Sequence, residues 1–476
     1  MTEALVSPSA LSSQAVDRPR AVAPRRQDDT ALEALTIELG RTIFREIPKH
    51  APSKISPARL DDLMMQLLMK DEDLRYRMLR FVDVYPALRT SKALGEHLEE
   101  FLTSPELATA GPGPFTALAQ FIGRSRAATR DAIRFASRFG ISRMGQQFIA
   151  GNTAEEVAKK IRRMEREGFL FSLDLLGEFV ASESQADHFT GRYLEMVERF
   201  GGLLGSEPAG RAASGPRVNI SIKLSSLTSK FEPMDPEGTS AAVRERLRPL
   251  MRAAQRSGAF INVDMEKYEY RDLTLQILLD LLDEGEFRGF ANLGTVHQAY
   301  LTDAVPVLEW FLAELRKRSQ PLTIRLVKGA YWDSEQIWAR AKGWPIPVIM
   351  EKRETDANYE RCLRVLLEQS DIVRTAVASH NVRSIAHAMA LAKALKVPAG
   401  RFEYQMLYGM AGPIKDALRT MGYPVRIYTP CGELLPGMAY LVRRILENTS
   451  NESFLRQRFA EGVSEEKLLS DPKSTR

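Results

Sequence analysis

Eight short β-rich runs, separated by helical stretches, constrain the fold of this chain more than any other feature. The runs are Phe169–Leu175, Arg217–Leu224, Phe260–Met265, Phe290–His297, Leu322–Lys328, Arg374–Ser379, Phe402–Met406 and Pro424–Tyr428. Regular alternation of strands and helices is typical of parallel sheets. Eight such units can close into a barrel whose chemistry lies at the carboxyl ends of the strands. We therefore predict an α/β fold built on a (βα)8 barrel of the TIM type.

The region before these runs has apolar residues at helical spacing and shows no strand. The expected helices are Ala31–Glu46, Pro57–Met69, Leu74–Val82, Leu94–Leu102, Phe115–Ile122 and Ala127–Arg138. We expect a disordered leader over 1–30, an all-helical N-terminal region over 31–165, the barrel over 166–455, and a C-terminal tail or truncation point over 456–476. The leader is Arg-rich, but Glu3 and Asp17 interrupt it, so we predict a tail rather than a transit peptide.

Composition excludes several classes of protein. No segment approaches the roughly 20 apolar residues that a membrane span requires. Cys362 and Cys431 are the only cysteines, and the six histidines include no H-E-x-x-H pair, so we expect no disulfide framework and no metal site. The net charge of +5 is modest and much of the excess lies in the leader, so we expect no specific nucleic-acid partner. Few cysteines and no span together favour a cytoplasmic protein.

Polar residues gather where the predicted strands end. Asn219, Ser221 and Lys223 share one parity on the second run, as do Asn262 and Asp264 on the third, so polar side chains point one way along each strand. Other polar residues at the ends of runs are Asp174, His297, Gln298, Arg325, Lys328, Ser379, His380, Gln405 and Tyr428. A purely structural barrel interior would carry Val, Ile and Leu there. This clustering favours a catalytic barrel.

The segment from Tyr440 to Glu447 indicates an anion site. On a helix, Tyr440, Arg443, Arg444 and Glu447 lie on one face, and the apolar residues between them lie on the other. Two adjacent guanidiniums suit a carboxylate, and an aromatic ring one turn earlier could cover the apolar part of the same ligand. Taken alone, the segment also fits a solvated helix face with an Arg443 to Glu447 ion pair.

The run from Arg325 to Trp332 indicates a second binding region, at the end of the fifth strand. It contains two cations, Arg325 and Lys328, followed by Gly329 and two aromatic residues. Strand alternation would place the cations on opposite faces, so we expect Lys328 to lie already in the loop. Glycine beside cations suits close approach of the backbone to a diphosphate, and Trp332 offers a plane for an aromatic cofactor. No G-x-G-x-x-G motif supports a Rossmann nucleotide fold.

These motifs together resemble those of the proline dehydrogenase family. They are Ser221–Ser225, Val263–Glu266, Arg325–Trp332, Ala378–Asn381, Phe402–Met410, Arg426–Tyr428 and Tyr440–Asn448, in this order. The resemblance spans about residues 165 to 455. The helical region before it is similar to the amino-terminal part of the bifunctional bacterial form of the family, proline utilization A.

The resemblance implies a distorted (βα)8 barrel that binds FAD and oxidises L-proline to Δ1-pyrroline-5-carboxylate, with a membrane quinone, ubiquinone or similar, as electron acceptor. It implies peripheral association with the inner face of the membrane. It also implies roles for individual residues. Substrate binding would fall to Lys223, Arg443, Arg444, Tyr428 and Tyr440, and catalysis to Asp264, Tyr331 and Lys223. FAD contacts would come from Met265, Gln298, Arg325, Lys328, Gly329, Ala330, Trp332, Ser379 and His380.

Hydride transfer from the ring carbon next to nitrogen needs a protein that orients the ring, neutralises the carboxylate and excludes water. Three cations would serve the carboxylate, and we expect Asp264 to offset part of the positive field near Lys223. Glu178, just after the first run, could pair with an arginine of the empty site as a gate. The family's aldehyde dehydrogenase half and its DNA-binding ribbon-helix-helix segment are not expected within these 476 residues.

Two other functions stay open at this point. A flavin-free lyase could use Lys223 or Lys328 as a Schiff base. It leaves the paired arginines and Trp332 unexplained. A non-catalytic scaffold could use the helical N-terminal region as its functional surface, but the polar residues at the ends of the predicted strands argue against it. The oligomeric state also stays open, a homo-oligomer included.

Overall fold

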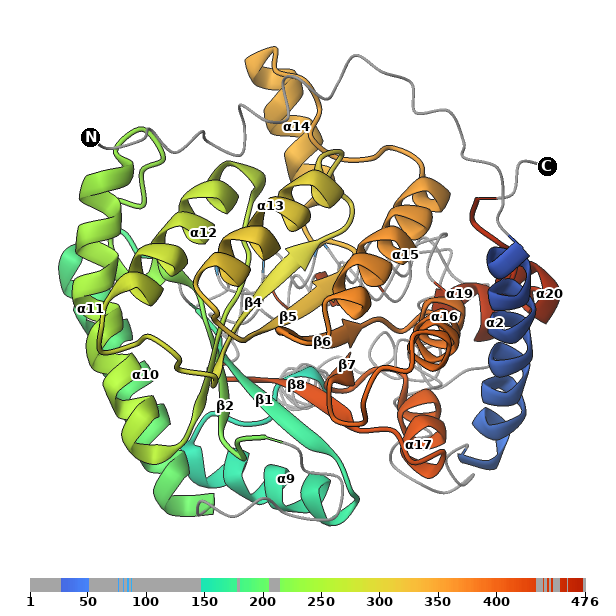
Figure 1. Cartoon of the computed structure of the whole chain (residues 1–476). Helices are drawn as coiled ribbons and strands as arrows, with labels where there is room; N and C mark the ends of the chain where they lie inside the picture. The colour runs from blue at the N-terminus through green and yellow to red at the C-terminus, as the bar shows by residue number, and fades with distance from the viewer. Residues whose placement is uncertain are drawn as a thin grey trace, which may run out of the picture.

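The computed structural model describes residues 27–50, 147–177, 180–204, 215–433 and 461–473, with most of 454–459 and a few isolated positions, among them 440, 443, 444 and 447. Its centre is a closed, all-parallel barrel in which each strand pairs with the next and β8 pairs with β1 (Figure 1). The predicted (βα)8 barrel is therefore confirmed. The strands are β1 Leu170–Leu175, β2 Asn219–Ile222, β3 Phe260–Val263, β4 Leu293–Gln298, β5 Leu322–Val327, β6 Val373–Ala378, β7 Phe402–Leu407 and β8 Val425–Cys431.

Helices alternate with the strands, and most of them surround the barrel (Figure 1). They are α9 Ala154–Arg166, α10 Glu183–Leu204, α11 Pro236–Ser257, α12 Tyr268–Asp283, α13 Ala304–Lys317, α14 Trp332–Lys342, α15 Lys352–Glu368, α16 Val382–Ala394, α17 Gly412–Thr420, α19 Phe454–Phe459 and α20 Glu465–Leu468. Short 3-10 turns occupy Ile47–His50 and Leu224–Leu227. No helix in the described parts of the chain is long and apolar enough to cross a membrane.

All eight strands differ from the predicted runs by one to three residues at one or both ends, and two of these differences have clear local reasons. The second run was expected to reach Leu224, but β2 stops at Ile222 because the Lys223 carbonyl accepts hydrogen bonds from the Ser226 amide and hydroxyl, which start a 3-10 turn. The eighth run was expected to end at Tyr428, but β8 continues to Cys431. Beyond Tyr428 it pairs only with β1, so Pro430 sits where a missing N–H is tolerated.

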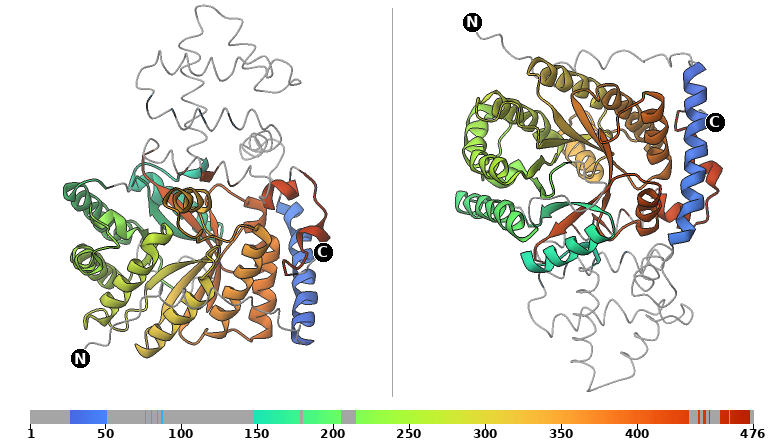
Figure 2. Two further views of the ribbon diagram at one scale, coloured as in Figure 1. Left: turned by 90° about the horizontal axis from the view of Figure 1, so that it is seen from above. Right: turned by 60° about the horizontal axis from the view of Figure 1, so that its bottom comes forward.

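Helix α2, Gln27–Glu46, confirms the first expected N-terminal helix and begins four residues before the expected start at Ala31. It packs along α16 on the outside of the barrel (Figure 2). A buried arginine fixes it there: Arg383 of α16 donates to Glu33 of α2 and to Glu360 of α15. The other expected N-terminal helices, from Pro57 to Arg138, lie outside the described ranges apart from isolated positions.

The interior of the barrel is polar at mid-height. Ser172, Asn219, Ser221 and Asn262 are all buried there, on the inward parity that the sequence predicted for the second and third strands. Ser172 Oγ donates to Asn219 Oδ1 over 2.6 Å, and Arg325 reaches Ser221 Oγ at 3.1 Å. Buried polar groups need such partners, so this network fixes the strands that carry the site.

Candidate active site

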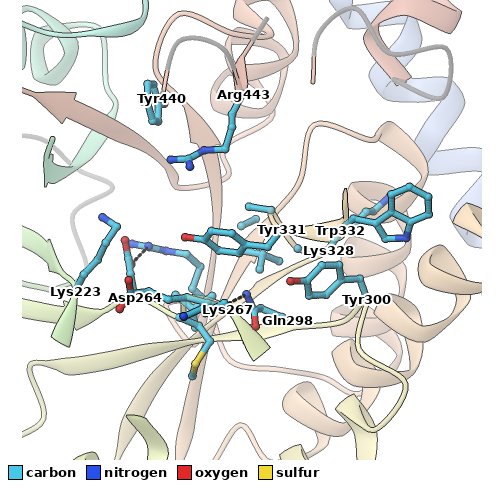
Figure 3. Close-up of a pocket in the computed structure, with 18 of the residues that line it drawn as sticks. Lys223, Asp264, Lys267, Gln298, Tyr300, Lys328, Tyr331, Trp332, Tyr440 and Arg443 are labelled. Carbon is cyan, nitrogen blue, oxygen red and sulfur yellow. Dashed lines mark hydrogen bonds and ion pairs between the residues drawn. The ribbon is translucent and has the colours of Figure 1, made fainter. Parts of the chain in front are cut away.

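One cavity of about 1670 Å³ opens at the carboxyl ends of the strands. Every predicted site residue except one lines it: Lys223, Asp264, Met265, Gln298, Arg325, Lys328, Gly329, Ala330, Tyr331, Trp332, Ser379, His380, Tyr428, Tyr440, Arg443 and Arg444. The exception is Glu178, which lies outside the described residues. Figure 3 shows Tyr440 and Arg443 facing Tyr331, with Lys223 and Asp264 beside them. Residues more than 200 positions apart therefore share one space.

Arg325 is the centre of the cavity floor. Its side chain is 6% exposed, and its three nitrogens bond to different strands: Nε to Gln405 Oε1 at 2.6 Å, Nη1 to Asp264 Oδ1 at 2.7 Å, and Nη2 to Ser221 Oγ at 3.1 Å. A guanidinium held by so many bonds has one orientation. Its Cζ lies 5.0 Å from the ring centroid of Tyr428. Arg325 therefore presents a fixed positive charge beneath the cavity.

Asp264 orients two groups at once. One of its carboxylate oxygens accepts from Arg325, and the other accepts from the Tyr428 hydroxyl at 2.7 Å. Burial and the neighbouring Asp174 carboxylate raise the pKa of Tyr428 well above its usual value, so the hydroxyl keeps its proton and remains a donor. Asp264 thus positions the Tyr428 ring on the cavity wall.

Lys223 pairs with a carboxylate to which the sequence analysis gave no role. Its ammonium bonds to Asp174 Oδ1 at 3.0 Å, whereas Asp264 is occupied by Arg325 and Tyr428. Asp174 is almost fully buried at the end of β1. Burial raises the pKa of Asp174, and the Lys223 charge opposes that rise. The charge of Lys223 is therefore offset by Asp174.

Four described residues between positions 440 and 447 line the cavity. Tyr440, Arg443, Arg444 and Glu447 are all helical, which confirms the predicted local conformation. Arg444 is buried and pairs with Glu447 at 2.7 Å, so the ion pair is not the Arg443 to Glu447 pair considered from the sequence. Arg443 is exposed, and its guanidinium lies 6.0 Å from the Tyr331 ring centroid. The two arginines thus have distinct environments within one helical turn.

His380 links this segment to β6. Its Nε2 accepts the Leu407 amide hydrogen at 3.1 Å, so the neutral ring carries its proton on Nδ1, which faces Glu447 Oε1 at 3.7 Å. Burial lowers the pKa of His380, which keeps the ring neutral. Glu447 consequently lies between Arg444 and His380 and connects the two.

The opposite side of the cavity carries the predicted cofactor residues. Lys328 lies just after β5, as expected, and pairs with Asp356 of α15. Gly329 has φ 147°, and a Cβ there would collide with the ring of Tyr300. Trp332 is 38% exposed at the rim, and its Nε1 donates to Ile349 O at 2.9 Å. Backbone approach, cations and an aromatic plane therefore coincide on this side.

Gln298 provides the clearest sign of a ligand. It is 3% exposed, and its Nε2 donates to Glu266 O at 3.0 Å, while its Oε1 has no hydrogen-bond partner within the described chain. A buried polar atom without a partner costs free energy unless a ligand satisfies it. An acceptor at this position suits an imide N–H of a flavin. The residues present on this side thus fit FAD.

Some residues at the cavity were missed or left without a role. Asp174 was noted at a strand end, but its pairing with Lys223 could not be read from spacing. Glu447 was considered only as a partner of Arg443. Nothing in the sequence singled out Tyr300 or Asp356, because a tyrosine after a strand and an acidic residue within a helix are both common. Their proximity to Gly329 and Lys328 depends on how β4, β5 and α15 pack.

Comparison with known proteins identifies the family. Residues 157–457 match the family model described as "Proline dehydrogenase". The chain belongs to the proline dehydrogenase family. Residues 33–148 also match the model "Proline utilization A N-terminal domain".

Several relatives show how much of the family the chain represents. It is 33% identical to the bifunctional protein PutA of Escherichia coli (strain K12) over 337 residues, which are 69% of this chain and 25% of that protein. It is 31% identical to the proline dehydrogenase of Deinococcus radiodurans over 336 residues, 70% of this chain and 96% of that one. The chain thus spans about a quarter of the PutA relatives and nearly all of this shorter one.

A solved structure agrees with the fold. Proline utilization A from Bdellovibrio bacteriovorus, inactivated by N-propargylglycine, matches 93% of this chain and 44% of its own, with a TM-score of 0.81 and 35% identity. The barrel and the order of its strands are therefore those of this proline dehydrogenase family.

Proposed function

We propose that this protein oxidises L-proline to Δ1-pyrroline-5-carboxylate in this cavity, with FAD as cofactor, and that a membrane quinone takes up the electrons. One observation supports this most: Lys223, Arg443 and Arg444 line the same cavity as the unsatisfied Gln298 oxygen and the Gly329 turn. An anionic amino acid and a flavin would then meet in the space between them.

The cations would hold the substrate carboxylate. Lys223 pairs with Asp174 and Arg444 pairs with Glu447, and both cations line the cavity, so a carboxylate could share them by charge-assisted bonds. Arg443 would complete the set from the exposed side. Binding of the carboxylate at this wall fixes where the ring carbon next to nitrogen must lie.

The tyrosines would cover the ring. Tyr428 is held by Asp264, and Tyr440 lies under Arg444, whose guanidinium is 4.9 Å from the ring centroid. Tyr331 follows the predicted cofactor loop and faces the same space. Aromatic walls exclude water and favour a compact apolar ring. Asp264 acts as a positioning residue in this scheme, because both its oxygens are occupied.

The predicted cofactor residues would bind FAD: Met265, Gln298, Arg325, Lys328, Gly329, Ala330, Trp332, Ser379 and His380. When bound, FAD supplies the hydride acceptor that no side chain can provide. The ion pairs argue against the alternative lyase, since Lys223 and Lys328 each hold a carboxylate and an ammonium must lose its proton before it attacks a carbonyl. We also propose the domain bounds expected from the sequence, with a helical region over 31–165 and the FAD-binding barrel over 166–455.

The decisive experiment is an absorption spectrum. Purified protein, reconstituted with FAD if necessary, should show a flavin spectrum that L-proline bleaches under anaerobic conditions. D-proline provides the control for a chiral carboxylate site. N-propargylglycine, which inactivated the Bdellovibrio protein, should inactivate this one and leave a modified spectrum. A protein that binds no flavin, or whose flavin proline leaves oxidised, would refute the proposal.

A further inference from the structure

Helix α19, Phe454–Phe459, has six residues and follows the positions between 440 and 447 that line the active-site cavity. An isolated helix shorter than about 12 residues is marginal in water, so α19 depends on packing against other elements. Phe454, its first residue, is buried and also lines the cavity. The position of this part of the cavity wall is therefore set by the elements that hold α19.

Phe44 of helix α2 holds α19 from outside the barrel. The Phe44 ring stacks on the Phe454 ring, with centroids 6.2 Å apart and planes inclined by 16°. Arg458, one turn further along α19, places its Cζ 4.7 Å from the centroid of the same Phe44 ring. Phe44 is 2% exposed, so these contacts are sealed from water. Both interactions are attractive and depend on the shape and position of the Phe44 ring.

Helix α2 is itself firmly anchored. Arg383 of α16 donates to both carboxylate oxygens of Glu33, at 2.6 and 2.7 Å, and to the Leu469 carbonyl at 2.7 Å. A Cβ at Gly40 would collide with the Leu469 side chain, so α2 and the C-terminal segment are in close contact. Figures 1 and 2 show α2 beside this segment. Because α2 is long and anchored and α19 is short, α2 fixes α19 rather than the reverse.

The segment that leads to α19 carries the arginines of the site. Arg444 pairs with Glu447 at 2.7 Å, and Glu447 faces His380 Nδ1 at 3.7 Å, which joins this segment to the barrel. Phe454 follows Glu447 by seven positions and lines the same cavity. The stacking of Phe454 on Phe44 is thus a further point at which the segment is held.

We propose that Phe44 is a positioning residue for the substrate site: by stacking on Phe454, it holds the segment that carries Arg443 and Arg444 in the geometry that binds the substrate carboxylate. No described residue of α2 lines the cavity, so Phe44 acts through α19. The proposal rests on the proposed function for the identity of the ligand, proline, and not for the packing itself. It gives the N-terminal region a part in substrate binding by the barrel.

The first test compares variants of the full chain reconstituted with FAD. In Phe44→Ala the KM for proline should rise roughly fivefold with kcat nearly unchanged, as expected of a residue that acts on a site without contacting the ligand. Phe44→Leu keeps apolar volume but loses the stacked ring, and should raise KM roughly twofold. Leu32→Ala is the matched control. It removes a buried side chain about 18 Å away along the same helix and should keep the wild-type KM.

A double-variant cycle tests the route. Because Phe44 acts through Phe454, Phe44→Ala should add no further rise in KM to the Phe454→Ala variant. Independent rises that add in the double variant would overturn the proposal, as would a wild-type KM in Phe44→Ala. An equal rise in Leu32→Ala would also overturn it, because a general loss of stability acts in both alanine variants.

Hydrogen exchange separates this proposal from the proposed function. Amides of positions 440–459 should exchange faster in Phe44→Ala than in wild type, and amides of the barrel strands should not. Unchanged exchange over 440–459 would overturn the positioning role whatever the kinetics. Wild-type protein that does not oxidise proline would refute the proposed function, and exchange would then decide the positioning role alone. If Phe44→Ala does not fold, Phe44→Leu should show the same changes at smaller size, and wild-type behaviour there would overturn the proposal.

Discussion

The barrel interior contains ion pairs near both ends of the strands, and the pairs at the two ends have different surroundings. Near the amino-terminal ends of β7 and β8, Glu403 and Arg426 are both buried. Arg426 Nε donates to Glu403 Oε1 at 2.6 Å, and Arg426 Nη2 donates to Glu403 Oε2 at 3.0 Å. Gln405 also donates to Glu403 at 2.7 Å, and Arg426 Nη1 donates to the Phe171 carbonyl. This pair is enclosed by protein on every side.

At the carboxyl ends, the ion pairs face open space. Lys223 with Asp174 and Arg444 with Glu447 both border the cavity, although Asp174 and Arg444 are buried. An enclosed pair can only stabilise or destabilise the fold, whereas a pair at a cavity can exchange or share its partner with a ligand. Whether a cation in this barrel serves folding or binding therefore depends on its height along the strand.

The largest effect should come from the enclosed pair. Arg426→Met leaves Glu403 buried with the more distant Arg374 at 3.5 Å. We expect the free energy of unfolding to fall by about 3 kcal/mol, because a buried carboxylate that keeps only a longer ion pair and the Gln405 bond is poorly compensated. Urea denaturation followed by circular dichroism measures it. Arg444→Met should change the same quantity far less, and equal losses in the two variants would contradict the comparison.

The second largest effect should be the loss of stability at low pH. Burial alone would raise the pKa of Glu403, but Arg426 and its other partners lower it to about 2 from 4.5. A depressed folded-state pKa contributes stability that is present above pH 4.5 and is lost as the pH falls toward 2. This contribution should be about 3 kcal/mol. Urea denaturation between pH 5 and 2 should show it in wild type and lack it in Glu403→Gln.

Substrate recognition should respond to the pair at the cavity. Arg444→Met keeps bulk but removes a charge-assisted bond of ~1.5–3 kcal/mol, so the KM for proline should rise roughly tenfold or more. FAD should stay bound. Arg443→Met tests the exposed neighbour and should have a smaller effect, because solvent screens an exposed charge. Steady-state kinetics decide the matter, and an unchanged KM in either variant removes that arginine from the substrate site.

The smallest effect concerns the aromatic cover. Tetrahydro-2-furoic acid has a ring and a carboxylate but no oxidisable N–CH, so it should compete with proline and leave the flavin oxidised. An open-chain carboxylate should bind severalfold more weakly, because it loses rotamer freedom on entry (about 0.5–1.5 kcal/mol for an immobilised chain). Inhibition constants for the two acids measure the difference. Equal constants would mean that Tyr428 and Tyr440 do not shape the pocket.

Much of the fold was predictable because it depends on local periodicity. A strand buried on both faces and a helix buried on one leave repeating apolar patterns, and eight strand–helix units have few ways to pack. The inward parity of Asn219 and Ser221 followed from alternation alone. Strand ends were less predictable: the hydrogen bonds of Ser226 and the one-sided pairing of Pro430 are not periodic features.

The sequence by itself determined the barrel, the end of the barrel that carries polar residues, and the segments that contribute them. Only the tertiary structure decided the partners: Asp264 with Arg325 and Tyr428, Lys223 with Asp174, and Arg444 with Glu447 rather than Arg443 with Glu447. It also decided that Phe44 of α2 packs against Phe454. Ion pairing and ring stacking depend on distances between side chains from separate elements, and no spacing along the chain encodes those distances.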